Sequence, residues 1–557
     1  MEPGETGGGD RGASKVAAGI LASRGAGLVR EVLIARFLGV GPFADVFRTA
    51  LRGPNLIQNL LGEQTLSAAF IPVYSRMVEA KAEEDSARFA GAMFGLLAAV
   101  AAVLVLAGEL LAEPFVALLA SGYLGDAAAV VAGEATVDRF PLAVEAIRWI
   151  FPMTGLLVLS AWSLAILNSH RRFFLPYVAP VLWNASIVAA LWWAGTRWAG
   201  VDPVGGGGLD PRGRIVIAAC IGALVGGLLQ FLVQLPAVLR LLDSFRPSFD
   251  WKARGIREAV GAFTPLLAGR GALQLSSFLD HWLASFLRAG AQSALGFAQG
   301  LYLLPVALFG MSVAAAGLPE YAREVHEAGV PGLSDRLAAA VRQSSYLTLP
   351  AAIGYLAVGW LVVAALFERG SFGLEDTWLV YLLLAAYAVG LPASVVTRQI
   401  NTVFYAAGKT RRPARVAVER ILVSAVLGSV AMVWLDGFRV GALLGLAGDQ
   451  PLYLGGLGLA LGAAVGAWFE LARMRRALRR EWPEIALPAR ALAAMAGLAA
   501  AAAIPAAGVW WLLRGRPHAL ALAAVLTVYG SVYFALCRMS GLSELAAWVG
   551  RLRRRRG

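Results

Sequence analysis

Charged and amide side chains interrupt two apolar runs near the start of this chain of 557 residues. In the second run they recur at the spacing of one helix face, at Asp45, Arg48, Arg52, Asn55, Asn59 and Glu63. Clustered arginines suit a phosphate or a carboxylate, because the planar guanidinium forms bidentate bonds and keeps its proton. Acidic neighbours can hold a coupling cation or balance the site. The pattern therefore predicts a binding site for an anionic cargo.

The first run adds three charged residues to this site. Arg24 and Glu31 share one helix face, and Arg30 is turned away from it by about 120°. Similar polar stripes in two later apolar runs contain Arg270 and Arg398, and we include both arginines among the candidate binding residues. The alternative for every stripe is a set of ion pairs and hydrogen bonds that only join helices.

The elements that carry these residues are expected to cross a membrane. The chain is 58% hydrophobic and only 15% charged, whereas soluble domains are about 25% charged. A helix needs about 20 apolar residues to span the hydrocarbon core. We predict an all-α polytopic membrane protein with about fourteen transmembrane helices, at 15–39, 44–74, 88–119, 146–168, 174–197, 214–241, 258–288, 293–321, 344–367, 377–406, 414–435, 451–472, 489–513 and 517–538.

The charges of the first two segments need a reason, because a charge at the bilayer centre costs at least about 2.5–3.5 kcal/mol on insertion scales. Pro54 lies within the second segment and is expected to interrupt and kink it. A kinked backbone is tolerated in lipid where it faces protein or water. We therefore expect the polar stripes to line a water-filled cavity.

The net charge of +13 follows the expected topology. Every second loop is basic, for example around Arg171, Arg411 and Arg475, whereas the alternate loops are acidic or weakly charged. By the positive-inside rule, the basic loops and both termini are cytoplasmic. The surplus charge is thus expected to contact anionic lipid headgroups, and nucleic acid is not an expected partner.

A weak internal repeat divides the chain. Residues 35–41 resemble residues 284–290, and residues 71–76 resemble 318–323, at nearly the same separation. Parallel repeats of this kind place the cargo between two lobes. We predict two pseudo-symmetric six-helix lobes, an added helix pair and two cytoplasmic tails, with the following ranges: disordered tail 1–13, N-terminal lobe 14–243, C-terminal lobe 254–474, helix pair 489–540 and basic tail 541–557.

Other chemistries find little support. The two cysteines lie in apolar runs, and the four histidines show no metal-ligand spacing. No phosphate-binding loop of an ATPase and no catalytic triad is visible. We therefore expect no cofactor and no enzyme activity, and transport driven by the membrane potential or by a monovalent cation at an unknown site.

The motifs between about residues 14 and 480 resemble the MviN/MurJ family of lipid II flippases, which belongs to the MATE-like MOP exporter superfamily. No single motif is specific, but their combination is. They are Ser23-Arg24, Gly27 and Arg30-Glu31; Ala35-Arg36-Phe37-Leu38-Gly39; Asp45; Pro54-Asn55-Leu56; Glu63; Ala69-Phe70-Ile71-Pro72; Leu167-Asn168; Gln234-Leu235-Pro236; and Leu366-Phe367-Glu368-Arg369-Gly370-Ser371-Phe372.

The resemblance implies a transporter that moves undecaprenyl-diphosphate-linked peptidoglycan precursor (lipid II) from the inner to the outer leaflet by alternating access. It implies a multi-pass protein of the bacterial cytoplasmic (inner) membrane, with an arginine-lined central cavity for the diphosphate. The helix pair 489–540 would provide a groove for the prenyl tail. Membrane lipids and cell-wall synthesis proteins are the expected partners, and we expect a monomer.

Two positions depart from the family. This chain has Gln58 and Gln299-Gly300 where the family often has an arginine and an Asp-Arg pair. We hypothesise that Arg48, Arg52 and Arg270 supply the missing positive charge. Of these, Arg52 joins Arg24 and Arg30 as the residues expected to contribute most to diphosphate binding.

Four alternatives remain open. A flippase or exporter of another polyprenyl-linked oligosaccharide fits the same site. A MATE-like small-molecule antiporter would need an anionic or aromatic site, whereas arginines dominate here. A membrane glycosyltransferase would need acidic catalytic residues on a large loop, and the candidate loops are short. A non-transporting scaffold is favoured only by the two missing arginines.

Overall fold

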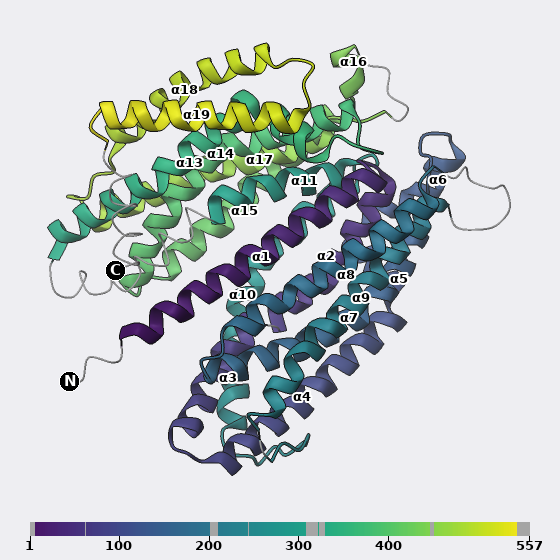
Figure 1. Cartoon of the computed structure of the whole chain (residues 1–557), viewed down its shortest axis with the longest axis vertical. Helices are drawn as coiled ribbons and strands as arrows, with labels where there is room; N and C mark the ends of the chain where they lie inside the picture. The colour runs from purple at the N-terminus through teal and green to yellow at the C-terminus, as the bar shows by residue number, and fades with distance from the viewer. Residues whose placement is uncertain are drawn as a thin grey trace. The chain divides into compact units, whose positions relative to one another are not determined.

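The computed structural model in Figure 1 describes residues 6–61, 63–200, 210–242, 244–307, 321, 329–445 and 451–542. These residues are mostly helical and form no strand, apart from an isolated β-bridge between Arg439 and Tyr453. The chain divides into two compact units, Met1–Gly290 and Ala291–Gly557. The predicted all-α fold class is confirmed.

Helices α1 to α10 make up the first unit. Within it, α9 packs against both α7 and α8, α1 lies along α8, and α2 and α4 pack against α7. The bounds are α1 Thr6–Leu38, α2 Pro42–Leu61, α3 Glu63–Glu79, α4 Glu83–Leu110, α5 Ala112–Leu119, η1 Ser121–Gly125, α6 Asp126–Val131, α7 Arg139–Ser169, α8 Phe174–Trp198, α9 Pro211–Leu239 and α10 Ile256–Ser285.

The second unit repeats this packing. Here α17 packs against both α14 and α15, and α13 packs against α14. Helix α2 begins at Pro42 and α11 begins at Ala291, the same separation as that between Ala35 and Ala284 in the first motif pair. The described bounds are α11 Ala291–Pro305, α13 Gly329–Phe367, α14 Leu374–Ala406, α15 Arg411–Leu435, α16 Val440–Leu444, α17 Gly455–Glu481, α18 Ala489–Leu512 and α19 His518–Met539.

The added pair α18 and α19 lies along α13 (Figure 1). Small side chains of α18, such as Ala499 and Ala502, are buried there together with Tyr529 and Tyr533 of α19. The two tyrosine hydroxyls donate to carbonyl oxygens of α13, at Pro350 and Tyr346, each over 2.8 Å. The alanine-rich composition of α18 therefore allows close packing on one side, while large apolar residues such as Ile504 remain exposed.

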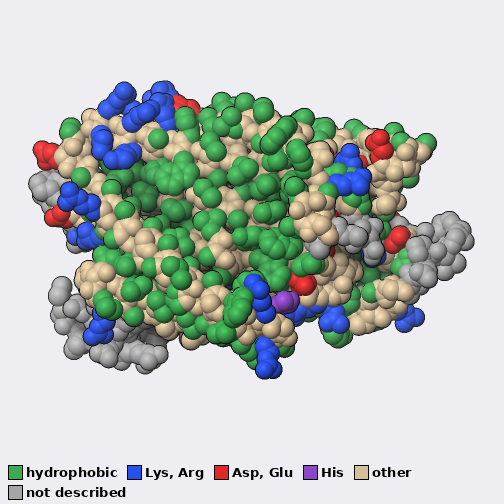
Figure 2. All heavy atoms as spheres, turned by 90° about the horizontal axis from the view of Figure 1, so that it is seen from above, with side chains coloured by type: hydrophobic (Ala, Val, Ile, Leu, Met, Phe, Trp, Pro, Cys, Tyr) green, Lys and Arg blue, Asp and Glu red, His purple; other side chains and the backbone are tan. Residues whose placement is uncertain are grey.

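Ten described helices are long and apolar enough to cross a membrane, and α5 with the segment η1–α6, bent by 103°, would make eleven. The predicted count of fourteen is not confirmed. Helices α1 and α2 are not among the ten, because arginines and acids interrupt their apolar runs. On the face drawn in Figure 2, hydrophobic side chains cover broad areas, and lysines and arginines gather in groups.

Helix α2 continues through Pro54 to Leu61, and α3 begins at Glu63. Gly62, between them, lies outside the described residues, so the single segment 44–74 stays a prediction. One predicted boundary is wrong. Helix α17 continues through the basic residues placed in a loop, as far as Glu481, because arginine and alanine favour helix outside the membrane as well.

The structure describes part of the predicted N-terminal tail, 1–13, but little of the predicted C-terminal tail, 541–557. Helix α1 already begins at Thr6, within the predicted disordered tail, because adding residues to an existing helix is far less costly than nucleating one. Residues 1–5 lie outside the described part of the chain. So does the basic tail after residue 542.

The connector between α9 and α10 is bound to α4 of the same unit. Its Ser248 N–H donates to the Gly91 carbonyl of α4 over 3.2 Å. Arg88 Nε donates to Asp250 Oδ2 over 2.8 Å, and Arg254 lies 3.3 Å from Asp85. The Arg88 hydrogen bond holds the pKa of Asp250 below its ordinary value, so the carboxylate stays charged at neutral pH.

The start of α10 is therefore fastened within the first unit, which extends to Gly290. The predicted boundary between the lobes, between residues 243 and 254, lies before α10, whereas the compact units divide after α10, at Gly290. That prediction follows the sequence repeat, in which α10 is the counterpart of α1. The compact units follow side-chain packing instead, and α10 packs on α2 and α3. The lobe ranges themselves stay a prediction.

Substituting Gly91 tests whether the contact between this connector and α4 stabilises the protein. A Cβ at Gly91 would lie 2.1 Å from the carbonyl oxygen of Arg246, so Gly91→Val must push the connector away. We expect a lower unfolding temperature of the purified protein and faster proteolysis between residues 244 and 255. The matched control is Gly497→Ala in α18, which meets nothing within 4 Å and is expected to stabilise its helix by about 0.5–1 kcal/mol. Equal unfolding temperatures for the two variants would contradict the prediction.

Candidate functional site

One carboxylate holds two of the predicted arginines together. Glu31 of α1 accepts a hydrogen bond from Arg30 through Oε1, over 2.9 Å, and another from Arg48 of α2 through Oε2, over 2.8 Å. The side chains of Arg30, Glu31 and Arg48 are 17%, 20% and 17% exposed. This cluster, called here the Arg30–Glu31–Arg48 cluster, joins the first two helices and carries a net charge of about +1 because two guanidinium groups face one carboxylate.

Helix α8 orients Arg30 from the other side. Arg30 Nη1 donates to Asn184 Oδ1 over 3.1 Å, and its guanidinium lies 5.2 Å from the centre of the Trp183 ring. The amide of Asn184 donates in turn to the Pro180 carbonyl over 3.1 Å, which leaves its oxygen for Arg30. A stacked and hydrogen-bonded guanidinium loses little entropy when it binds an anion.

The Arg30–Glu31–Arg48 cluster has spare donor capacity. A guanidinium offers five N–H groups. In the described part of the chain, the Nε of Arg30 is buried without a hydrogen-bond acceptor. A phosphate group that reaches Arg30 and Arg48 can therefore replace or share the bonds of Glu31, because charge-assisted bonds to phosphate are short and strong.

Asp45 belongs to a different cluster. Its side chain is fully buried, and Oδ2 accepts from the Gly290 N–H over 2.7 Å. The same oxygen lies 3.4 Å from Arg139 Nη1 of α7. Arg139 in turn donates Nε and Nη2 to the two oxygens of Asp126, over 2.6 and 2.9 Å. Its guanidinium also lies 4.1 Å from the centre of the Tyr123 ring.

This Asp45–Arg139–Asp126 cluster therefore joins α2, α6, α7 and the segment after α10. In this structure Asp45 is buried away from solvent, and its contact with substrate stays a prediction. One turn further along α2, the Thr49 hydroxyl lies 3.0 Å from Tyr123 Oη and 3.0 Å from His281 Nε2 of α10. Polar contacts thus fix the whole first half of α2.

Three of the other predicted site residues lie on α1 and α2, and one lies in the second unit. Arg24 is exposed on α1, and Arg52 and Asn55 are half-buried on α2 after Arg48. Arg398 is exposed on α14, in the second unit. The side chains of Glu63 and Arg270 lie outside the described residues. Gln299, at the position where the family often has an aspartate, donates to Tyr387 Oη over 2.9 Å.

The sequence analysis missed several contacts that matter. Asn184 follows Trp183 in an otherwise apolar helix, and a lone amide in such a run was the signal that could have identified it. Arg139 lies at the end of its helix, where a basic residue is ordinary, so the sequence held no comparable signal. Among the described residues, no group of three or more His, Cys, Asp or Glu side chains could hold a metal ion.

The chain matches the sequence model of one protein family, described as "Lipid II flippase MurJ", over residues 34–529. A probable lipid II flippase MurJ of Rhizobium meliloti is 32% identical over 71% of this chain and 70% of its own length. A lipid II flippase MurJ of Burkholderia cenocepacia is 30% identical over 72% and 74%. The Vibrio cholerae relative is 27% identical over 83% and 81%.

Two solved structures share the fold. A lipid II flippase MurJ in an inward closed conformation aligns with a TM-score of 0.69 at 20% identity, covering 94% of this chain and 98% of that one. An inward-facing multidrug resistance MATE transporter of the MOP superfamily aligns with a TM-score of 0.61 at 13% identity, covering 83% and 96%. At these identities the likeness concerns the fold.

Proposed function

Because the chain belongs to the MurJ family of lipid II flippases, we propose that it carries lipid II from the inner to the outer leaflet of the cytoplasmic membrane. The chain is a transporter, not an enzyme, and a multi-pass inner-membrane protein. Its cargo is consumed in peptidoglycan synthesis. The family match over most of the chain favours this reading over the antiporter, glycosyltransferase and scaffold alternatives.

The Arg30–Glu31–Arg48 cluster is the observation that carries the proposed binding mode. The diphosphate of the cargo is the part that bears negative charge, and it competes with Glu31 for Arg30 and Arg48. Arg52, one turn after Arg48, and Arg24, at two turns before Glu31, extend the positive lining. When no cargo is bound, Glu31 keeps the two guanidinium groups from repelling each other.

Alternating access supplies the movement in this proposal. The two units expose the bound headgroup to one side of the membrane and then to the other, and the prenyl tail stays in lipid along α18 and α19. A monovalent cation or the membrane potential supplies the energy. Both termini and the basic loops are on the cytoplasmic side, in accordance with the positive-inside rule.

The test is replacement of a host's own flippase. We expect this chain to restore growth and outer-leaflet lipid II in bacteria depleted of their lipid II flippase. Outer-leaflet lipid II is measured by its cleavage with an enzyme added outside the inner membrane. Arg24→Ala is expected to lower both readouts at equal membrane abundance. Wild-type protein that is present in the membrane but restores neither readout would contradict the proposal.

A further inference from the structure

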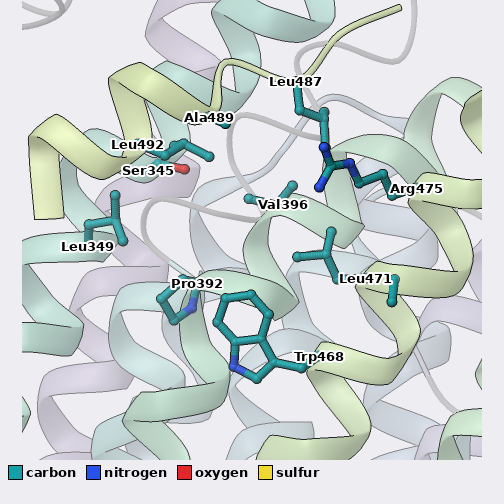
Figure 3. Close-up of a pocket in the computed structure, with 11 residues that line it drawn as sticks. Ser345, Leu349, Pro392, Val396, Trp468, Leu471, Arg475, Leu487, Ala489 and Leu492 are labelled. Carbon is teal, nitrogen blue, oxygen red and sulfur yellow. The ribbon is translucent and has the colours of Figure 1, made fainter.

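A cavity of about 300 Å³ lies within the second unit. Pockets that hold a small ligand start at about this volume. Side chains of α13, α14, α17 and α18 and of the short link before α18 line the cavity (Figure 3). They are Ser345, Leu349, Pro392, Val396, Trp468, Leu471, Ala472, Arg475, Leu487, Ala489 and Leu492.

The lining is apolar except at two places, Ser345 and Arg475. Figure 3 shows Arg475 extending its guanidinium towards the side of Leu487, with Trp468 and Pro392 on the other side of the cavity. Trp468 precedes Arg475 by seven residues, which is about 10 Å along a helix axis. One end of the cavity therefore carries a positive charge, and most of the remaining lining is apolar.

Arg475 forms no ion pair with an acidic residue in the described part of the chain, unlike two other basic residues, Arg473 and Lys409. Neighbouring Arg473 is held by Glu419 through two hydrogen bonds of 2.8 and 3.0 Å, and Lys409 is paired with Glu481. No carboxylate within the described chain lies within ion-pair distance of Arg475. A cation at the mouth of an apolar cavity matches a ligand with one anionic group and a long apolar chain.

The position of the cavity fits the level of lipid headgroups. The last two turns of α17 are basic, from Arg473 to Arg480, and the turns before them are apolar. Tryptophan and arginine both favour the membrane interface. Basic pockets between transmembrane helices bind the headgroups of anionic lipids. The expected cytoplasmic side of the membrane carries these basic residues.

We propose that this cavity binds an anionic glycerophospholipid, with the phosphate group at Arg475 and part of one acyl chain between Leu349, Leu471 and Leu492. The bound lipid fastens the start of α18 to α13 and α17, because its chain contacts all three helices. None of the lining residues is among those proposed to bind the cargo, and the inference does not depend on which cargo is carried.

The experiment measures lipid retained by the purified full-length protein in mixed micelles. The probes are phosphatidylglycerol, which is anionic, and phosphatidylcholine, which carries the same chains without net charge. We expect wild-type protein to retain roughly fivefold more phosphatidylglycerol, the effect of one arginine near an anionic headgroup. Arg475→Ala is expected to remove this preference. Arg476→Ala changes a neighbour that is also exposed but does not line the cavity, and this variant is expected to keep the preference.

A second variant tests the acyl chain. Ala472 is exposed and lines the cavity, so Ala472→Phe fills the space while Arg475 keeps its charge. We expect this variant to lose retention of both phospholipids. Equal losses in Arg475→Ala and Arg476→Ala would indicate a diffuse basic surface and overturn the proposal. Full retention in Ala472→Phe, or displacement of the retained lipid by undecaprenyl phosphate at equal concentration, would overturn it too.

Discussion

Arg30→Ala is expected to reduce lipid II binding by about 10- to 100-fold and to abolish rescue of flippase-depleted cells. A hydrogen bond to a charged group contributes about 1.5–3 kcal/mol, and each 1.4 kcal/mol is about tenfold in affinity. The variant also leaves Glu31 and Arg48 as a neutral pair, so the cluster loses its positive excess. Binding to purified protein and growth rescue provide the two measurements.

The control is Arg36→Ala in the same helix. Arg36 is exposed, and its guanidinium lies 5.6 Å from the ring centres of Phe37 and of Trp192, away from the Arg30–Glu31–Arg48 cluster. Lipid II binding and rescue are expected to match those of the wild type. Arg30→Lys keeps the positive charge but loses the planar guanidinium that forms two parallel hydrogen bonds to one anion. We therefore expect its affinity for lipid II to lie between those of the wild type and Arg30→Ala. Wild-type binding by Arg30→Ala would show that the diphosphate is bound elsewhere.

Arg139→Ala is expected to lower the amount of folded protein in the membrane more than any other single change discussed above. Its side chain is 5% exposed and lies between Asp45 and Asp126. Removing one partner of a buried ion pair costs about 3–5 kcal/mol, because the remaining charge stays buried without compensation. Membrane abundance and the unfolding temperature in detergent measure the effect.

Two companion variants decide whether charge causes this loss. Arg148→Ala changes an exposed arginine of the same helix, 3.9 Å from Glu113, and is expected to shift stability by no more than about 0.5 kcal/mol. Adding Asp45→Asn and Asp126→Asn to Arg139→Ala removes the uncompensated charges and is expected to restore part of the lost abundance. If the triple variant is no better than Arg139→Ala, the arginine acts through packing instead.

The helices themselves could largely be predicted from the sequence. Segment 174–197 agrees closely with α8, and segment 146–168 lies within α7, which begins seven residues earlier at Arg139. Hydropathy over about 20 residues reports membrane helices directly. The cationic character of the first two helices could also be predicted from their charged residues. The meeting of Arg30 and Arg48 at Glu31 could not, because spacing along the helix turned Arg30 away from the face of Glu31 and Arg48 belongs to another helix.

Pairing between distant helices could not be predicted. Periodicity tells which residues of one helix share a face, but not which helix lies opposite. Asp45 faces Arg139 of α7 and the Gly290 N–H, although it shares a stripe with Arg48.

The order in which the chain is synthesised gives the Asp45–Arg139–Asp126 cluster a role in biogenesis. Asp45 leaves the ribosome 94 residues before Arg139. Its side chain is fully buried in the folded protein, and a buried charge without its partner costs several kcal/mol. Helix α2 therefore gains its full stability in lipid only after α7 has been made. We expect the early helices to remain beside the insertion machinery until then, so that the first unit is released into the bilayer as a group.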